Sequence, residues 1–185
     1  MRSKLFLLML TLPTFLFCQT QSNSFYSAYG IGVPVNTHFG LVEGLSGTGI
    51  GLRLPFSINT KNPAALNSVQ EPFTSILSTG FDMEFIQVRD ESESGFTGGG
   101  GLTHLDLWLK LNSKWAINLG ISPFSEVNYS IIAERFFEPE GRDYLVLYEG
   151  DGGITQFRLD QSYEILKNLN LGLSGFVYFG SITKS

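Results

Sequence analysis

Cysteine, basic residues and long apolar segments are all scarce in this sequence. Its 185 residues include one cysteine, Cys18, which excludes a disulfide framework. The 12 Lys and Arg residues are outnumbered by 17 Asp and Glu, for a formal net charge of −5. We expect no nucleic-acid partner, because phosphate binding needs clustered basic side chains. Beyond the first residues, no apolar run reaches the roughly 18 residues of a membrane-spanning helix, which excludes a helical membrane protein.

The N-terminus has the features of a secretory signal peptide. Arg2 and Lys4 precede an apolar stretch over residues 5–17, and Pro13 interrupts that stretch. The stretch is short for a transmembrane helix, so we predict that residues 1–18 are a signal peptide that is removed after Cys18. The alternative is a lipoprotein in which Cys18 carries the lipid. In both cases the sequence predicts an exported protein.

Composition divides the rest of the chain into two parts. Residues 19–70 are rich in Gly, Ser, Asn and Pro, which predicts short turns and tight loops. From residue 71 onward, long segments alternate apolar and polar side chains, as pleated strands with two different faces do. The predicted strands lie near residues 73–89, 102–111, 115–134, 154–165 and 169–180.

The apolar side chains of these strands fall mostly on odd-numbered positions. In the third strand, Val127, Tyr129 and Ile131 continue that apolar series. The even-numbered positions are mixed and include charged residues such as Asp106 and Arg158. A soluble secreted sandwich would bury the apolar face in a core, whereas a membrane barrel would present it to lipid.

Four features favour the barrel. The strands are about ten or more residues long, the second face is polar, aromatic residues gather near strand ends, and the chain is exported. Long connections at 90–101 and 136–153 alternate with tight turns at 112–114 and 167–170, as in outer-membrane barrels. We expect the glycines at 98–101 to form a flexible loop tip.

The predicted fold is therefore all-β: an antiparallel transmembrane β-barrel preceded by an irregular N-terminal hatch over residues 19–70. Small barrels need about eight strands, so the roughly five strands of residues 71–185 cannot close. We expect an incomplete barrel, the N-terminal portion of a longer protein, located in the outer membrane of a gram-negative cell. The expected surroundings are the lipid bilayer and lipopolysaccharide.

One short motif connects the irregular segment to a known family. Asn62, Pro63 and Ala64 lie within a Gly-rich run at 44–66, just before the first predicted strand. This arrangement, with the segments YSAYGIG and WAINLGISPFSEVNY, resembles the outer-membrane long-chain fatty acid and hydrocarbon transporter family (FadL/TodX type). The resemblance implies that the N-P-A turn belongs to a hatch inside the barrel. It also implies Tyr26 and Tyr29 as further hatch or ligand-path residues.

The motif also has a purely local interpretation. Pro63 fixes its own backbone angle and keeps Asn62 out of the helical region. Asn62 can then cap a short helix that begins with Pro63 and continues through Ala64. A simple helix-start turn would explain these residues without any functional role.

The sequence offers no catalytic or metal-binding constellation. His104 and Asp106 share one strand face, but no serine nucleophile is tied to them by spacing, so we expect no enzyme activity. The acidic segments at 90–93 and 149–153 lack the spacing of a calcium loop. We therefore expect no metal and no cofactor.

The sequence is compatible with two kinds of function. The family resemblance implies passive uptake of a hydrophobic small molecule such as a fatty acid. The alternative is an accessory barrel subunit of a protein secretion system, with secretion-system subunits as partners, or a structural outer-membrane protein.

Overall fold

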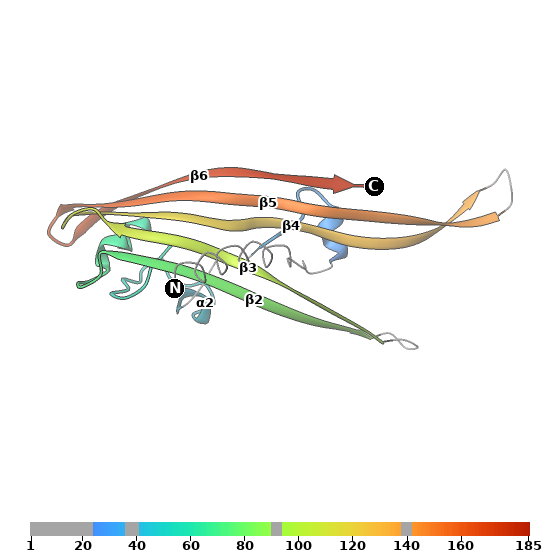
Figure 1. The fold of residues 1–185 in the computed structure, drawn as a ribbon, viewed down its shortest axis with the longest axis horizontal. Coiled ribbons are helices and arrows are strands. Elements are labelled where there is room, and N and C mark those ends of the chain that lie inside the picture. The colour runs from blue at the N-terminus through green and yellow to red at the C-terminus, as the bar shows by residue number, and fades with distance from the viewer. Residues whose placement is uncertain (1–23, 36–40, 90–93, 138–141) are drawn as a thin grey trace, which may run out of the picture.

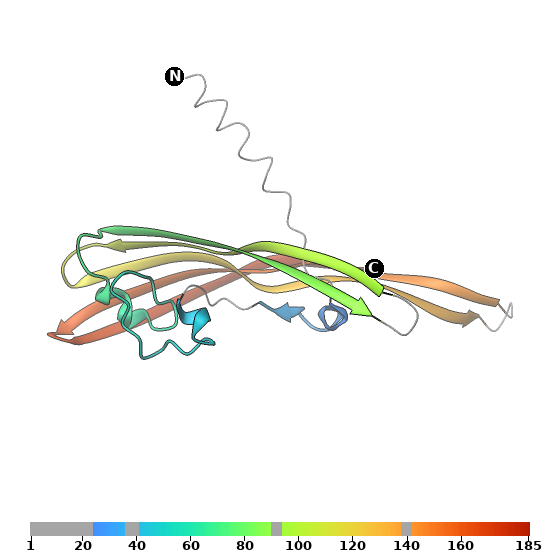
Figure 2. The same cartoon turned by 90° about the horizontal axis from the view of Figure 1, so that it is seen from below.

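A computed structural model of the protein describes residues 24–35, 41–89, 94–137 and 142–185. Long strands form one twisted sheet, and short helical turns lie against one of its faces (Figures 1 and 2). Within the described ranges, no helix combines the length and the apolarity needed to cross a membrane. The predicted signal peptide, residues 1–18, lies outside the described ranges.

The sheet is antiparallel throughout, and from β2 to β6 the strands that follow one another in the chain also lie side by side in the sheet (Figure 1). Its strands, in spatial order, are β2 (Ser75–Arg89), β3 (Ser94–Lys110), β4 (Trp115–Phe137), β5 (Arg142–Leu166) and β6 (Leu169–Lys184). The short strand β1 (Val33–Pro34) pairs with β4. The all-β, antiparallel prediction is confirmed, with six strands in place of about five. The sheet does not close, and β2 and β6 are the ends of its main path.

Two predicted loops are strands. The glycines at 98–101, predicted as a loop tip, pair with residues 82–85 of β2. Most of the predicted long connection at 136–153 belongs to β5, which begins at Arg142. Backbone pairing needs no particular side chain, so a neighbouring strand can hold a segment whose own residues favour a loop.

The sheet has an inner face, on which the N-terminal elements lie, and an opposite outer face. Even-numbered residues of β5 and of the first part of β4 point inward. Phe124 is an extra residue in β4, because Pro123 pairs with Thr155 and Ser125 with the next residue, Ile154. This bulge shifts the alternation by one residue. The prediction that Val127 and Tyr129 share the apolar outer face is therefore wrong: both are buried on the inner face.

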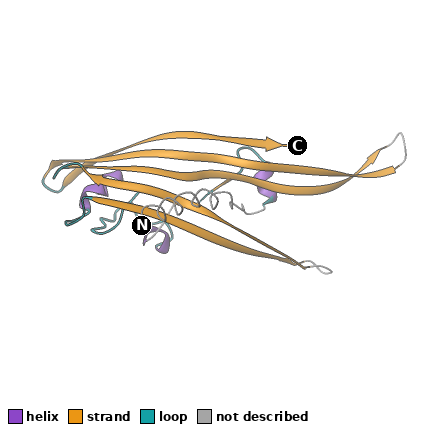
Figure 3. Ribbon diagram, in the orientation of Figure 1, coloured by secondary structure: helices purple, strands orange, loops and turns teal. Residues whose placement is uncertain are grey.

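The N-terminal elements are short and cover the inner face (Figure 3). They are η2 (Phe25–Ala28), β1, α2 (Leu41–Gly44) and η3 (Pro63–Ser68), where η marks a 3₁₀ helix. A hydrophobic core lies between η3, its neighbouring residues and the sheet, and consists of Ile58, Leu66, Val69, Trp108 and Ala116. The Trp108 indole N–H donates to the Leu66 carbonyl at 3.1 Å, so the ring is also oriented.

Close approach of η3 to the sheet depends on small residues beneath it. A Cβ on Gly172 of β6 would overlap the Ala64 backbone nitrogen. The Ser162 hydroxyl donates to the Ala64 carbonyl at 3.0 Å. The Asn67 amide donates to the Lys114 carbonyl at 2.7 Å. Both ends of η3 are thus bound directly to the sheet.

Replacing Gly172 by valine should weaken this docking. We expect Gly172→Val to destabilise the protein by about 1–3 kcal/mol, because the new side chain meets backbone that cannot move aside cheaply. Gly175→Ala is the matched control, since the nearest neighbour of a Cβ there is the Leu159 carbonyl at 4.0 Å. Urea unfolding in detergent, followed by tryptophan fluorescence, measures both. Equal midpoints for the two variants would show that η3 does not rest on Gly172.

Candidate functional site

Arg158 of β5 is the centre of a buried polar network on the inner face. Its guanidinium Nη2 lies 2.7 Å from Oδ1 of Asp106 in β3. Its Nε lies 2.7 Å from Oδ2 of Asp160 in the same strand. All three side chains are buried. An arginine between two carboxylates suits this setting, because each charge has an opposite partner nearby.

Two neutral residues complete the network. The Asn118 amide of β4 donates to Asp106 at 2.7 Å and to Asp160 at 3.2 Å. The Ser174 hydroxyl of β6 donates to Asp160 at 2.6 Å. The network therefore spans four adjacent strands, from β3 to β6. A Cβ on Gly120 would clash with the Asp106 carboxylate, so glycine there leaves room for the ion pair across β4.

His104 and Asp106 each have several polar neighbours on the inner face. The two His104 ring nitrogens lie 3.0 Å from the hydroxyls of Ser78 and Thr103. The Asp106 carboxylate is bonded to Asn118 and Arg158. Across the described part of the chain, His, Cys, Asp and Glu form no group of three or more that could hold a metal.

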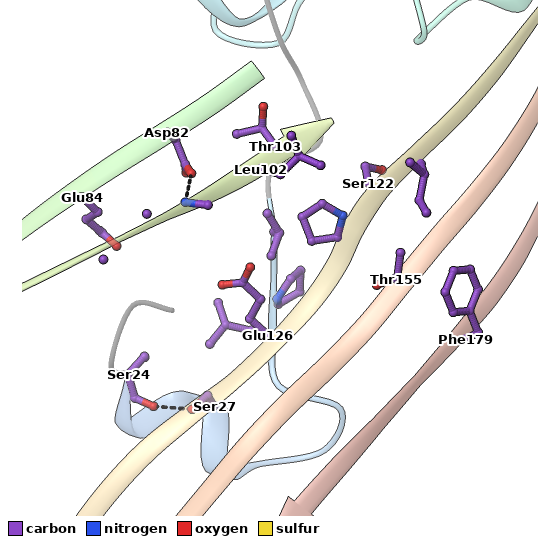
Figure 4. A pocket seen from close by; sticks show the side chains of 18 residues that line it. Ser24, Ser27, Asp82, Glu84, Leu102, Thr103, Ser122, Glu126, Thr155 and Phe179 are labelled. Atoms are coloured by element: carbon purple, nitrogen blue, oxygen red, sulfur yellow. Dashed lines mark hydrogen bonds between the residues drawn. The ribbon is translucent and has the colours of Figure 1, made fainter. Parts of the chain in front are cut away.

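A cavity opens beyond the network, where β3 and β4 separate. They pair only over residues 105–110 and 116–121, after which β3 stays with β2 and β4 with β5. The cavity has a volume of about 570 Å³ and is lined from both sides of the split (Figure 4). Its lining includes three carboxylates and several apolar side chains: Asp82, Glu84, Glu126, Leu102, Ile121 and Phe179.

Residues 24–35 run along the edge of β4 beside this cavity. Val33 and Pro34 pair with Glu126 and Ser125 as strand β1. At the two ends of the segment, Val35 N donates to the Phe124 carbonyl at 3.0 Å and Ser24 N to the Asn128 carbonyl at 3.1 Å. The segment therefore covers part of the edge that β3 leaves unpaired.

The N-P-A residues lie at the other end of the inner face. Asn62 caps η3, its side chain accepts from Ala64 N at 3.1 Å, and Pro63 is the first residue of the helix. The predicted helix-start turn is confirmed. None of these residues lines the cavity, and Tyr26 and Tyr29 do not line it either. Those two side chains are 82% and 78% exposed, and the hatch and ligand-path roles of all five residues stay predictions.

Sequence reasoning recognised the inner face as polar but missed the network. Asp106, Asn118, Arg158 and Asp160 all occupy even positions of predicted strands. Their register across β3, β4 and β5 was the missing information, since it decides which side chains meet. A single Arg followed two residues later by Asp160 on the same strand face, with Asp106 on the polar face of another strand, is the signal that could have suggested a buried ion pair.

Removing the guanidinium should strongly destabilise the fold. We expect Arg158→Ala to cost about 3–5 kcal/mol, because Asp106 and Asp160 would remain buried without their cation. Arg135→Ala is the control: Arg135 is exposed and bonds Tyr148 only at 3.4 Å, so its loss should cost under about 0.5 kcal/mol. Urea unfolding midpoints compare the two. A similar midpoint for both variants would refute a stabilising role for the network.

Comparison with known proteins identifies the family. The family model for BamG matches residues 1–185, the whole chain. No curated protein and no solved structure matches the chain. The resemblance to the FadL/TodX transporters is therefore wrong, because the N-P-A residues that suggested it encode a helix start that any family can use. The chain belongs to the BamG family and is an outer-membrane protein related to the Bam complex.

Proposed function

We propose that the protein is an accessory subunit of the Bam outer-membrane assembly complex, and that it does not act as an uptake channel. The observation that carries the proposal is the contrast between its two faces. The outer face is apolar and exposed, whereas the inner face is closed by a buried ion-pair network and by the N-terminal elements. Membership of the BamG family supports the same role.

The outer face carries large apolar side chains on every long strand. On β4, Ile117, Leu119 and Ile121 are half-buried, whereas Ile132 and Phe136 are exposed. Phe85 and Phe96 stack across β2 and β3 with ring centroids 5.9 Å apart. Exposed apolar residues of this face include Leu77, Phe81, Met83, Leu105, Phe157, Leu159, Leu171, Leu173 and Val177. A patch this extensive is rare on a soluble monomer and supports contact with lipid or with a membrane partner.

We further propose that β2 to β6 form part of the wall of a transmembrane β-barrel. Backbone groups at the edges of β2 and β6 could not stay unpaired in a hydrocarbon layer, so another strand or a partner must cover them. The outer face would then contact the bilayer, with lipopolysaccharide on the cell-surface side.

Arginine on the outer face tests this orientation. We expect Leu173→Arg, about four residues from the tight turn, to lose about 2–4 kcal/mol of membrane stability. Leu169→Arg, beside the same turn, should lose only about 0–1 kcal/mol, since the penalty falls near the interface. The folded fraction in outer membranes, measured by heat-modifiable gel mobility, reports both. Equal folding of the two variants would contradict lipid contact.

We also propose that the protein has no catalytic activity. His104 and Asp106 are engaged in separate hydrogen bonds, which supports a structural role for both.

Co-purification tests the proposed complex. We expect the tagged full-length protein, extracted from outer membranes in mild detergent, to retain other Bam subunits in quantity. A deletion strain assayed for uptake of a labelled fatty acid is the matched experiment, and we expect its uptake to be unchanged. Purification without any Bam subunit, together with reduced uptake, would reverse the proposal in favour of transport.

A further inference from the structure

We propose that the edge of β4 beyond its split from β3 is a docking site for an extended polypeptide segment that carries basic residues. Residues 24–35 occupy the first part of this edge in the structure. The occupant would be a strand of a partner protein, added to the sheet by backbone pairing. This inference goes beyond the proposed function and does not depend on the apolar outer face.

The edge offers regular backbone partners. Asn128 uses its carbonyl to accept from Ser24 N, and its N–H donates to the Ser27 hydroxyl at 3.2 Å. Strand periodicity turns the backbone groups of Ser130 and Ile132 to the same side. Among the described strands, only β5 pairs with β4 over this stretch. Within the described residues, the edge therefore offers the backbone of Ser130 and Ile132 beyond the bonds that Ser24 and Ser27 make to Asn128.

The N-terminal segment occupies the edge irregularly, through bonds that include Ser27 Oγ to the Asn128 carbonyl at 3.1 Å and Ser125 Oγ to the Ile31 carbonyl at 2.7 Å. Its regular pairing is limited to Val33 and Pro34, and a proline has no N–H to donate. Gly32, at φ +95°, passes so close to the Glu126 carbonyl that a Cβ would overlap it. The exposed side chains of Tyr26 and Tyr29 add little packing. A longer strand could make more hydrogen bonds and displace this segment.

The negative charge of the cavity lining favours a docked strand that carries basic side chains. Asp82 and Glu84 from β2 and Glu126 from β4 line the cavity beside the edge (Figure 4), and among the described residues that line it none is Lys or Arg. A strand lying here would present alternate side chains to these carboxylates and to apolar neighbours such as Leu102. The favoured occupant therefore alternates Lys or Arg with apolar residues.

Peptide binding to the purified full-length protein in detergent micelles tests the proposal. The probes are fluorescent peptides of about ten residues that alternate lysine with valine, or glutamate with valine. We expect the lysine peptide to bind at least about tenfold more tightly by anisotropy, because only it complements the carboxylates. The combined variant Asp82→Asn, Glu84→Gln should reduce that preference.

An engineered disulfide that fixes the N-terminal segment on β4 tests whether the peptide binds at this edge. Pro34 and Ser125 are register partners, so Pro34→Cys with Ser125→Cys should fix the N-terminal segment on β4 when oxidised. We expect oxidation to weaken binding of the lysine peptide at least about tenfold, and reduction to restore it. The control pair is Leu109→Cys with Ile117→Cys, which are partners where β3 and β4 already pair, and its oxidation should change nothing.

A photoreactive residue at Ile132 gives a second measurement that does not depend on the lock. We expect it to cross-link the lysine peptide, whereas the same residue at Leu171 on the outer face should not. Undiminished binding by the locked protein, equal binding of both peptides, or no cross-link at Ile132 would each overturn the proposal. These results are separate from co-purification with Bam subunits, so either proposal can fail alone.

Discussion

Pairing of the Arg158 guanidinium with two carboxylates is the interaction on which the inner face depends. It joins β3 to β5 across the width of β4, where Gly120 leaves the space. A buried charge without a partner is costly, and a slip of one residue would turn these side chains to the other face. The network therefore stabilises a single register of the three strands.

That register divides the inner face into a packed end and an open end. Toward the tight turns, the row Ala116, Ser162 and Gly172 is small enough for η3 to approach and form a hydrophobic core. On the other side of the network, β3 and β4 separate and the cavity opens. Packing of η3 thus stabilises the end of the sheet near the tight turns, whereas at the other end β3 and β4 do not pair with each other.

Local patterns were predicted well, and patterns that depend on a partner strand were not. The Asn62 cap and the Pro63 helix start involve adjacent residues, so the sequence alone shows them. The glycines at 98–101 were misjudged because β2 supplies their hydrogen bonds. Val127 was assigned to the wrong face because the bulge at Phe124 exists only in the pairing with β5.

The amino-acid sequence by itself determined that long antiparallel strands form, that they carry one apolar and one polar face, and where the tight turns lie. These properties follow from side-chain period and turn chemistry, which act over a few residues. Only the tertiary structure decided that Arg158 meets Asp106, that residues 24–35 lie on β4, and that β3 and β4 separate. Each of these depends on strand register, which is set by many distant contacts acting together.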